Sequence, residues 1–170
     1  MIETERLLLR PHVASDFGAF KAMSQDPDVM RYIGREPSSD DESWLRFLAH
    51  FGRWELLGYG LLAVIEKGTD RYIGDAGFGD FRRGLGPDFD PFHEAAWIFS
   101  AAGQGKGYAF EAMTAAHSWL HKTFNPGKTV CIISPENIPS IRLAAKLGYQ
   151  ETGLSRYKDS DVLMFERINP

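Results

Sequence analysis

The chain has 170 residues, of which 44% are hydrophobic and 25% charged, with a formal net charge of −4 and a single cysteine, Cys131. It has no basic stripe of the kind that binds phosphates, which argues against a nucleic-acid partner, and no apolar run near the roughly 18–20 residues of a membrane span. One cysteine excludes an internal disulfide framework and suits a reducing compartment, so the composition predicts a single cytoplasmic domain over residues 1–170 with no membrane partner.

The first third of the chain predicts one strand followed by two helices. The strand Arg6-Leu7-Leu8-Leu9-Arg10 is stopped by Pro11, and Ser15 and Asp16 are placed to cap a helix that runs to about Met23. The stretch Gln25-Asp26-Pro27-Asp28 breaks that helix. Apolar residues at spacings of three to four predict a second helix that begins after Ser38-Ser39-Asp40 and passes Leu56.

From Tyr59 the pattern changes to strands. A hairpin, a loop rich in glycine, proline and aspartate, and a further strand are followed by a long helix that begins near Tyr108. The predicted ranges are Tyr59–Ile65, Tyr72–Phe81, the loop 82–93, Ala95–Ser100, a strand at Thr129–Ile133, a helix at Ile138–Leu147, and closing strands at Tyr149–Glu151 and Val162–Arg167. This order predicts an α/β sheet with helices on both faces.

The sharpest local motif is Gly103-Gln104-Gly105-Lys106-Gly107-Tyr108-Ala109, between a strand and a helix. Alternating glycines allow a tight turn and a close approach of ligand to backbone, and a helix N-terminus attracts anions. The spacing does not fit a P-loop, which needs a hydroxyl after the lysine, nor the dinucleotide fingerprint G-x-G-x-x-G. The motif therefore indicates another phosphate-bearing ligand, or a glycine-rich helix entry that binds none.

The spacing that fits is Q/R-x-x-G-x-G/A, carried by Gln104, Gly107 and Ala109, and it resembles the pyrophosphate-binding motif of the GNAT acetyltransferase superfamily. The segment Asn137-Ile138-Pro139-Ser140, followed by an aliphatic helix that ends at Gly148-Tyr149, resembles the second motif of that family. The opening Glu3-Thr4-Glu5-Arg6-Leu7-Leu8-Leu9-Arg10 is similar to the subgroup of ribosomal-protein alanine and serine N-acetyltransferases. The resemblance covers essentially the whole chain in the right order.

This resemblance implies a mixed, mostly antiparallel twisted sheet, flanked by helices on both faces and splayed at the strand that binds acetyl-CoA. It also implies that acetyl-CoA is the cosubstrate and that the chain can form a homodimer. The cofactor-binding residues it implies are Trp97, Ile98, Phe99, Gln104, Gly105, Lys106, Gly107, Tyr108, Ala109 and Asn137.

Acetyl transfer to an amine needs a base, a donor to the oxyanion and an acid for the leaving thiolate. Glu94, at the head of the implied acetyl-CoA strand, is the first candidate for the base, with a solvated glutamate or a neighbouring His93 as alternatives. Many relatives carry a tyrosine acid seven residues after the motif asparagine, but Ala144 stands there. Ser140 matches the hydroxyl that the ribosomal-type subgroup places near the sulfur, and it is also placed to cap a helix.

Acidic and aromatic residues gather in the two segments that build the acceptor site in this fold, 26–42 and 82–93, and they suit a cationic amine or a solvated rim equally. The acidic residues are Asp26, Asp28, Asp40, Asp41, Glu42, Asp88 and Asp90. The leading hypothesis is an acetyltransferase for protein N-termini. The alternatives are an enzyme for polyamines, amino acids or aminoglycoside-like amines, and an acyl-CoA-binding module without catalysis. His117 and His121 share a helix face but lack a third ligand, so no metal is expected.

Overall fold

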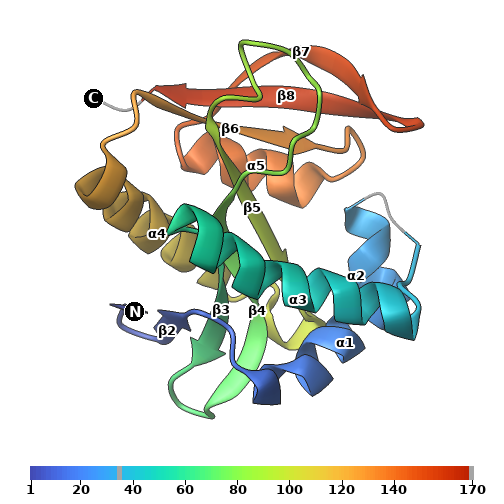
Figure 1. Cartoon of the computed structure of the whole chain (residues 1–170), viewed down its shortest axis with the longest axis vertical. Helices are drawn as coiled ribbons and strands as arrows, with labels where there is room; N and C mark the ends of the chain where they lie inside the picture. Colours follow the sequence, from blue (N-terminus) through green and yellow to red (C-terminus); the bar gives the residue numbers. More distant parts are fainter. Residues whose placement is uncertain (34–35, 169–170) are drawn as a thin grey trace.

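One eight-stranded sheet carries the rest of the structure (Figure 1). The computed structural model describes residues 1–33 and 36–168. The strands are β1 (Ile2–Glu3), β2 (Leu7–Arg10), β3 (Leu61–Glu66), β4 (Arg71–Gly79), β5 (His93–Phe99), β6 (Lys128–Ile133), β7 (Gln150–Tyr157) and β8 (Ser160–Ile168). The helices are α1 (Phe17–Gln25), α2 (Pro27–Tyr32), α3 (Asp40–Leu57), α4 (Tyr108–Phe124) and α5 (Ile138–Lys146), with 3-10 turns at Ala14–Asp16 and Ala101–Gly103.

The sheet order is β1-β2-β3-β4-β5-β6-β8-β7, and within the described residues β5 and β6 are the only parallel neighbours. Helices α1 and α3 pack on one face through Phe20 and Phe47, while α4 packs on the other through Met113 and Leu120. These four side chains are almost fully buried, and burial of each contributes about 1.5–3 kcal/mol. The predicted mostly antiparallel sheet with helices on both faces is therefore confirmed. None of the described helices has the length and apolar character to cross a membrane.

Helix α3 begins where its sequence predicts. Ser39 and Glu42 form a capping box, in which the Ser39 amide donates to Glu42 Oε2 at 2.8 Å and the Glu42 amide donates to Ser39 Oγ at 3.4 Å. The helix ends at Gly58, whose φ of 73° is left-handed.

The prediction that residues 25–28 only end the first helix is incomplete, because they also start α2. Asp26 Oδ1 accepts the Asp28 amide at 2.9 Å and Pro27 occupies the first turn, where it needs no N–H partner. The predicted cap of α1 is wrong. Asp16 makes no cap bond to α1, because its carboxylate pairs with Arg10 at 2.7 Å and accepts the Val13 amide at 2.9 Å.

The sheet opens between β5 and β6. Their registered pairs are His93–Thr129 and Glu94–Val130, after which β5 continues along β4 to the pair Gly74–Phe99. Meanwhile β6 follows β8 to the pair Ile133–Leu163. The two parallel strands thus diverge beyond Glu94, as the predicted splay requires, and the β5 edge beyond that point is available to a ligand.

Candidate active site

The open edge of β5 is bounded by the N-termini of α4 and α5. Trp97, near the middle of the diverging part of β5, donates from Nε1 to Ser140 Oγ in α5 at 3.1 Å. The sequence-predicted residues Trp97 and Ser140 therefore lie together, one on each side of the gap. Because the Ser140 oxygen accepts this bond, its own proton is available for donation toward another group.

The glycine loop presents backbone at the start of α4. Gly105 and Gly107 have φ angles of 72° and 79°, a left-handed conformation that glycine adopts at little cost. No side chain caps the helix at Gly107, so the amides of the first turn, those of Tyr108 and Ala109 among them, point to the N-terminal end without a capping acceptor. These free donors and the helix dipole make an anion site.

The side chains of this loop have partners within the protein. Gln104 Nε2 donates to the Phe99 carbonyl at 2.9 Å, which ties the loop to the end of β5. Tyr108 donates its hydroxyl to Glu66 Oε1 at 2.6 Å, and Lys106 Nζ lies 3.6 Å from the same oxygen. In this arrangement the loop offers an anion its backbone N–H groups rather than these side chains.

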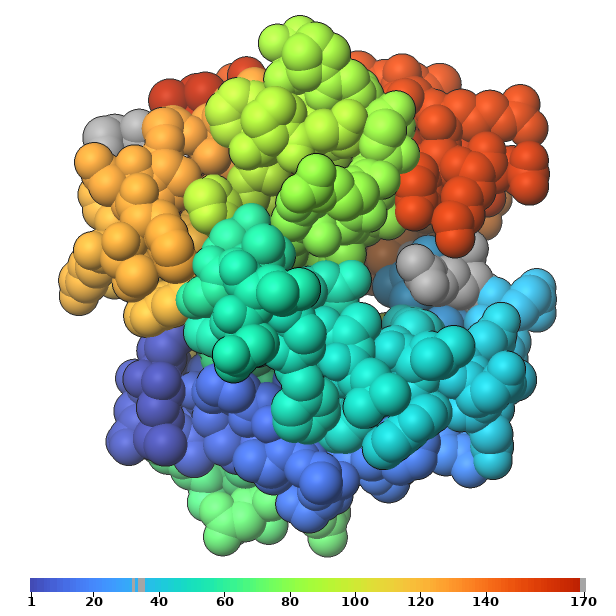
Figure 2. Space-filling model, in the orientation of Figure 1, coloured from blue at the N-terminus to red at the C-terminus, as the bar shows by residue number. Residues whose placement is uncertain are grey.

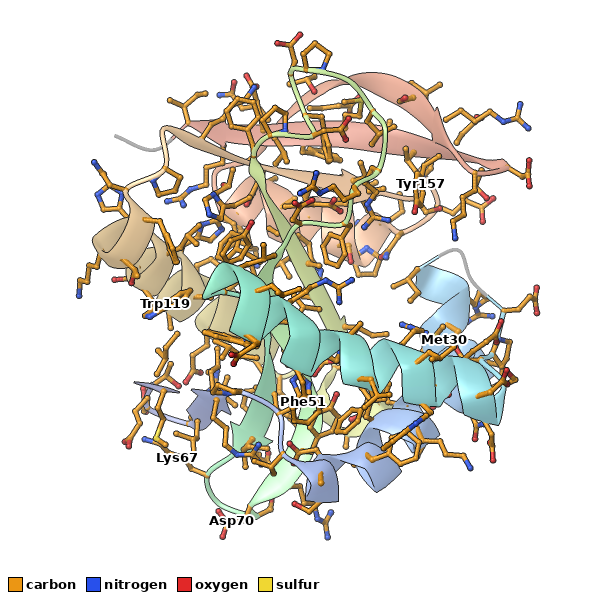
Figure 3. All side chains as sticks on the ribbon, in the orientation of Figure 1. Met30, Phe51, Lys67, Asp70, Trp119 and Tyr157 are labelled. Carbon is orange, nitrogen blue, oxygen red and sulfur yellow. The ribbon has the colours of Figure 1, made fainter. Side chains whose placement is uncertain are left out.

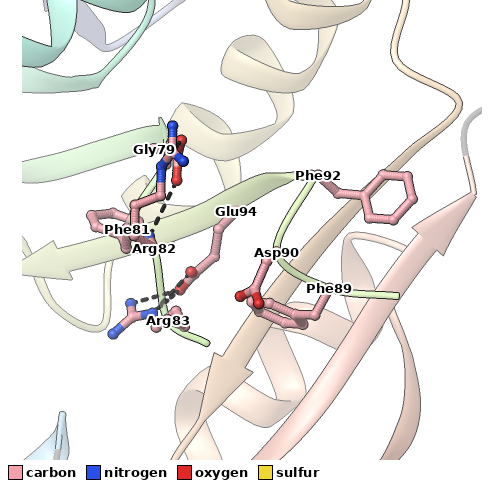
Figure 4. A pocket seen from close by; sticks show the side chains of 9 residues that line it. Gly79, Phe81, Arg82, Arg83, Phe89, Asp90, Phe92 and Glu94 are labelled. Carbon is pink, nitrogen blue, oxygen red and sulfur yellow. Dashed lines mark hydrogen bonds and ion pairs between the residues drawn. The ribbon is translucent and has the colours of Figure 1, made fainter. Parts of the chain in front are cut away.

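Glu94 is buried on β5, with 4% of its surface exposed, and is bound by Arg83. Arg83 Nε lies 3.0 and 2.9 Å from its two oxygens, and Nη2 lies 2.6 Å from Oε1 (Figure 4). Burial raises the pKa of the Glu94 carboxyl, and the Arg83 guanidinium acts in the opposite direction. A small pocket also lined by Phe89 and Asp90 adjoins this pair (Figure 4).

Arg83 is held between two aromatic rings. Its guanidinium carbon lies 4.8 Å from the Phe81 ring centroid and 4.7 Å from that of Tyr157. A side chain added at Gly79 would place its Cβ 2.7 Å from the Phe81 ring, so the small residue in β4 allows this packing. Arg83 was not predicted as a site residue from the sequence, although Arg82-Arg83 is the basic pair of its loop.

The N-terminus of α5 is built by Asn137 and Ser140. Asn137 Oδ1 accepts the Ser140 amide at 3.1 Å, so Asn137 caps the helix and Ser140 keeps its hydroxyl for Trp97. Ser140 was expected to cap the helix together with Asn137, but the cap is the Asn137 side chain alone, and Ser140 contributes only the backbone amide that this side chain accepts. Ala144 is fully buried, and no phenol stands at that position.

Among the described residues, the histidines and Cys131 make no direct side-chain bond to Glu94, although Cys131 is close enough for the Glu94 charge to help raise the pKa of its thiol. His93 packs its ring against Tyr59 and Phe124, at centroid distances of 4.6 and 5.6 Å, on the side of α4. Burial raises the pKa of the Cys131 thiol well above its usual value, so it is no ready nucleophile. His117 is buried and bonded to Tyr149 and Arg167, whereas His121 is exposed on the surface of α4.

The acidic residues of the expected acceptor segments mostly have structural partners. Asp26 caps α2, Glu42 belongs to the capping box of α3, and Asp40 pairs with Lys21 at 2.7 Å. Asp90 accepts the amides of Leu85 and Gly86 at 3.1 and 2.9 Å. Part of the first segment, residues 34–35, lies outside the described residues.

The surface is hollowed between α3, the loop 80–92 and the β7–β8 hairpin (Figure 2). Tyr157 projects from that hairpin on the side of the hollow (Figure 3). The Arg83–Glu94 pair therefore lies where the early helices, the central loop and the last hairpin approach one another.

Comparison with known proteins gives one consistent result. The family described as acetyltransferase (GNAT) domain matches residues 6–150. The uncharacterized N-acetyltransferase p20 of Bacillus licheniformis is 30% identical, covering 97% of this chain and 94% of that protein. A structure from Bordetella pertussis, described as a GnaT-family acetyltransferase, is 33% identical with a TM-score of 0.85 over 98% of each chain.

Two more distant structures share the fold. The ribosomal-protein-S5-alanine acetyltransferase of Vibrio fischeri superposes with a TM-score of 0.75 at 18% identity, over 98% of this chain and 95% of that one. The spermidine N-acetyltransferase of Vibrio cholerae, solved with CoA and spermine, superposes with 0.76 at 19% identity, over 97% and 96%. The fold is thus shared by proteins with different acceptors.

Proposed function

This chain belongs to the GNAT acetyltransferase family, and from that premise we propose that it transfers the acetyl group of acetyl-CoA to the N-terminal α-amine of a polypeptide. The family and the N-acetyltransferase activity follow from the match over residues 6–150 and from the relatives. The donor site, the catalytic residues and the acceptor are the proposal, and each is supported by the geometry around β5.

The donor site consists of the glycine loop and the open edge of β5. The first-turn amides of α4, with Gly105, Lys106 and Gly107, would bind the pyrophosphate, and Trp97, Ile98 and Phe99 would pair with the pantetheine arm along the diverging strand. Gln104 holds the loop to Phe99, and Asn137 holds the start of α5. Acetyl-CoA supplies an activated thioester carbonyl when it is bound.

A backbone N–H of the segment 96–99 is the donor we assign to the developing oxyanion, because this edge of β5 has left β6. Ser140 is the group we assign to protonate the leaving thiolate. Its oxygen is occupied by Trp97 Nε1, so its proton is directed to other acceptors. Direct attack by the amine on the thioester forms the amide and releases free CoA thiol.

The observation that carries the choice of acceptor is the Arg83–Glu94 ion pair. The guanidinium occupies both carboxylate oxygens of Glu94 and offsets part of the rise in pKa that burial causes, so an amine that supplies a useful free-base fraction by itself is favoured. At pH 7 an α-amine of pKa near 8 is about 10% free base, whereas an alkylamine near 10.4 is well below 0.1%. This difference favours an α-amine over a lysine or polyamine nitrogen.

A small-molecule amine is the second candidate, and amino acids satisfy the same argument because they also present α-amines. Polyamines are less favoured, since acidic residues such as Asp26, Asp40 and Asp90 already cap helices, pair with lysine or accept loop amides. A module that binds acyl-CoA without catalysis is disfavoured by the family membership.

The test is acetyl-CoA turnover, measured as free thiol release, with matched acceptors. The panel contains peptides with a free N-terminus, the same peptides with a blocked N-terminus and a free lysine, amino acids, spermidine and an aminoglycoside. We expect turnover with free N-terminal peptides and loss on blocking. Turnover with spermidine, or with the lysine of the blocked peptide, would contradict the proposed acceptor while leaving the transferase activity in place.

A further inference from the structure

A second polar cluster lies beneath α3, away from Glu94. His12 follows β2, His50 belongs to α3 and Asp75 belongs to β4, and the exposed fractions of their side chains are 1%, 6% and 1%. Asp75 Oδ1 lies 2.7 Å from His12 Nε2, and Asp75 Oδ2 lies 3.8 Å from His50 Nε2. The two imidazole rings are stacked with centroids 4.1 Å apart.

The buried charge of Asp75 needs compensation. Removing an ionised carboxylate from water costs several kcal/mol unless a cation or strong donors accompany it. Its ion-pair partners among the described residues are these two imidazoles, and Tyr72 donates its hydroxyl to Oδ1 at 2.7 Å. Two positively charged stacked rings would repel each other, so the two rings cannot both supply the compensating charge. A cation bound between the carboxylate and two neutral rings would supply it without that repulsion.

Each histidine is also incompletely satisfied. His12 Nδ1 and His50 Nδ1 are buried and have no hydrogen-bond partner among the residues that the structure describes. Buried polar atoms are paired in most native proteins, so two orphaned nitrogens in adjacent rings are unusual. A cluster that served only to fill the core would be built more easily from apolar side chains.

We propose that His12, His50 and Asp75 bind one divalent transition-metal ion, for which Zn²⁺ has the right preferences. One ligand atom from each residue can be chosen so that all three lie within 4.8 Å of one another. Donors around a tetrahedral zinc with bonds of about 2.0–2.2 Å are roughly 3.3–3.6 Å apart, so small side-chain rotations suffice. Imidazole nitrogens suit zinc and its neighbours, whereas Mg²⁺ and Ca²⁺ prefer oxygen.

The surroundings provide two other features of a metal centre. The Tyr72 hydroxyl orients the Asp75 carboxylate from outside the ligand set. A surface pocket of about 530 Å³ is lined by His12 and His50 together with Pro11, Phe51, Trp54 and Glu55, and it provides an entry path and room for a water ligand. Phe51 marks this flank of α3 in Figure 3. Binding turns the stacked rings toward a common point and replaces the contact between His12 Nε2 and Asp75 Oδ1.

The ion would join α3, β4 and the segment after β2, next to β5, the strand proposed to bind acetyl-CoA. Asp75 is registered opposite Ile98 of β5, and His50 lies on the helix that covers this face of the sheet. A metal held by both would fix α3 against the sheet on the acceptor side. We therefore assign the ion a structural role, so its binding should raise the thermal stability of the chain and is not needed for the acetyl transfer itself.

The experiment titrates the metal-free chain with Co²⁺, whose visible absorption reports a low-coordinate nitrogen and oxygen environment, and then with Zn²⁺ in competition. We expect one Co²⁺ per chain, its absorption abolished by one equivalent of Zn²⁺, and a higher melting temperature with Zn²⁺ but not with Mg²⁺. Absence of saturable binding, or a Zn²⁺ melting shift no larger than that of Mg²⁺, would overturn the proposal.

Variants locate the site. His50→Gln and Asp75→Asn should each lower the Co²⁺ affinity at least tenfold, whereas His121→Gln, which removes an exposed histidine, should leave it unchanged. Circular dichroism identifies any variant that has lost its fold, and the wild-type titration decides the question in that case. Equal binding by wild type, His50→Gln and Asp75→Asn would place the metal elsewhere and refute the assignment.

Discussion

The guanidinium of Arg83 binds both carboxylate oxygens of Glu94, at 2.6 Å for the shortest contact. Both side chains are largely buried, and the aromatic rings of Phe81 and Tyr157 enclose the guanidinium. In the proposed mechanism, the Glu94 carboxylate is therefore shared between the Arg83 guanidinium and the incoming amine.

Glu94→Gln should lower kcat by about 10²–10⁴-fold if Glu94 accepts the proton of the amine, because the amide cannot do so. The dissociation constant for acetyl-CoA should stay the same, since the glycine loop lies at the other end of β5. Thiol-release kinetics and calorimetry measure the two effects. Glu151→Gln, which neutralises an exposed glutamate in β7, is the control, and an unchanged rate in Glu94→Gln would remove Glu94 from the mechanism.

Arg83→Met should move the acidic limb of the kcat/KM profile to higher pH. The guanidinium opposes the effect of burial on the pKa of Glu94, so without it burial alone acts and the base becomes protonated at higher pH. The free energy of unfolding should fall by about 3–5 kcal/mol, because one member of a buried pair is left alone. Arg82→Met is the matched control, since the neighbouring Arg82 is exposed, and a limb that stayed in place would contradict the coupling.

Gly107→Ala should weaken acetyl-CoA binding by about tenfold. A φ of 79° costs a residue with a Cβ about 1–2 kcal/mol, so the loop would change its conformation and turn the first amides of α4 away from the ligand. Calorimetry with CoA measures the loss. Gly127→Ala is the comparison, because a Cβ at that site meets nothing within 4 Å and its φ is not in the left-handed region. Equal affinities would show that the loop does not bind the pyrophosphate.

Ser140→Ala should reduce kcat by about 10²-fold with little change in acetyl-CoA affinity. The helix cap at this position uses the Ser140 amide, so it survives the substitution, while the hydroxyl that accepts from Trp97 is lost. Pre-steady-state thiol release measures the chemical step directly. A poorer leaving thiol should deepen the defect, whereas a loss of affinity alone would indicate a binding role.

His117→Gln should make the free energy of unfolding depend less steeply on pH below about pH 6.5. Burial, and then the charge of Arg167, lowers the pKa of His117 to about 3 in the folded chain, against about 6.5 when unfolded. Between these values the unfolded chain binds a proton that the folded chain does not. The contribution of neutral His117 to the free energy of unfolding is therefore complete above pH 6.5. It is lost as the pH falls below that value, by up to about 1.4 kcal/mol per pH unit.

Glutamine can replace both hydrogen bonds of His117, to Arg167 and Tyr149, without titrating. Chemical denaturation at pH 7.5, 6.0 and 4.5 measures the effect. The exposed His121→Gln should behave like the wild type. A His117→Gln profile as steep as that of the wild type would mean that other groups control the acid limb.

Local sequence signals predicted the central elements well. The capping box at Ser39 and Glu42 marks the start of α3, and the glycine loop marks the start of α4. The last hairpin was predicted too short, since β7 runs to Tyr157 through residues that are mostly exposed and polar and lack an apolar period. The short helix α2 was missed because Pro27 was interpreted only as a breaker.

Site residues that depend on tertiary contacts were out of reach of the sequence. Glu94 and Ser140 could be proposed from the sequence because they occupy motif positions, but Arg83 is eleven residues from Glu94 in an irregular loop. His12, His50 and Asp75 are separated by tens of residues and meet only when α3 packs on β4. The histidine pair considered from spacing, His117 and His121, has one buried and one exposed member.

The divergence of β5 and β6 also leaves one side of an interior strand without a registered strand partner beyond Glu94, as at the edge of a sheet. An unpaired strand edge can add a strand from another chain, and proteins usually protect such edges by twisting, charging or covering them. Here the ligand that fits the gap would serve as that cover. If the donor binds in this gap as proposed, the chain without donor is expected to self-associate more readily than the chain with donor, which light scattering can measure.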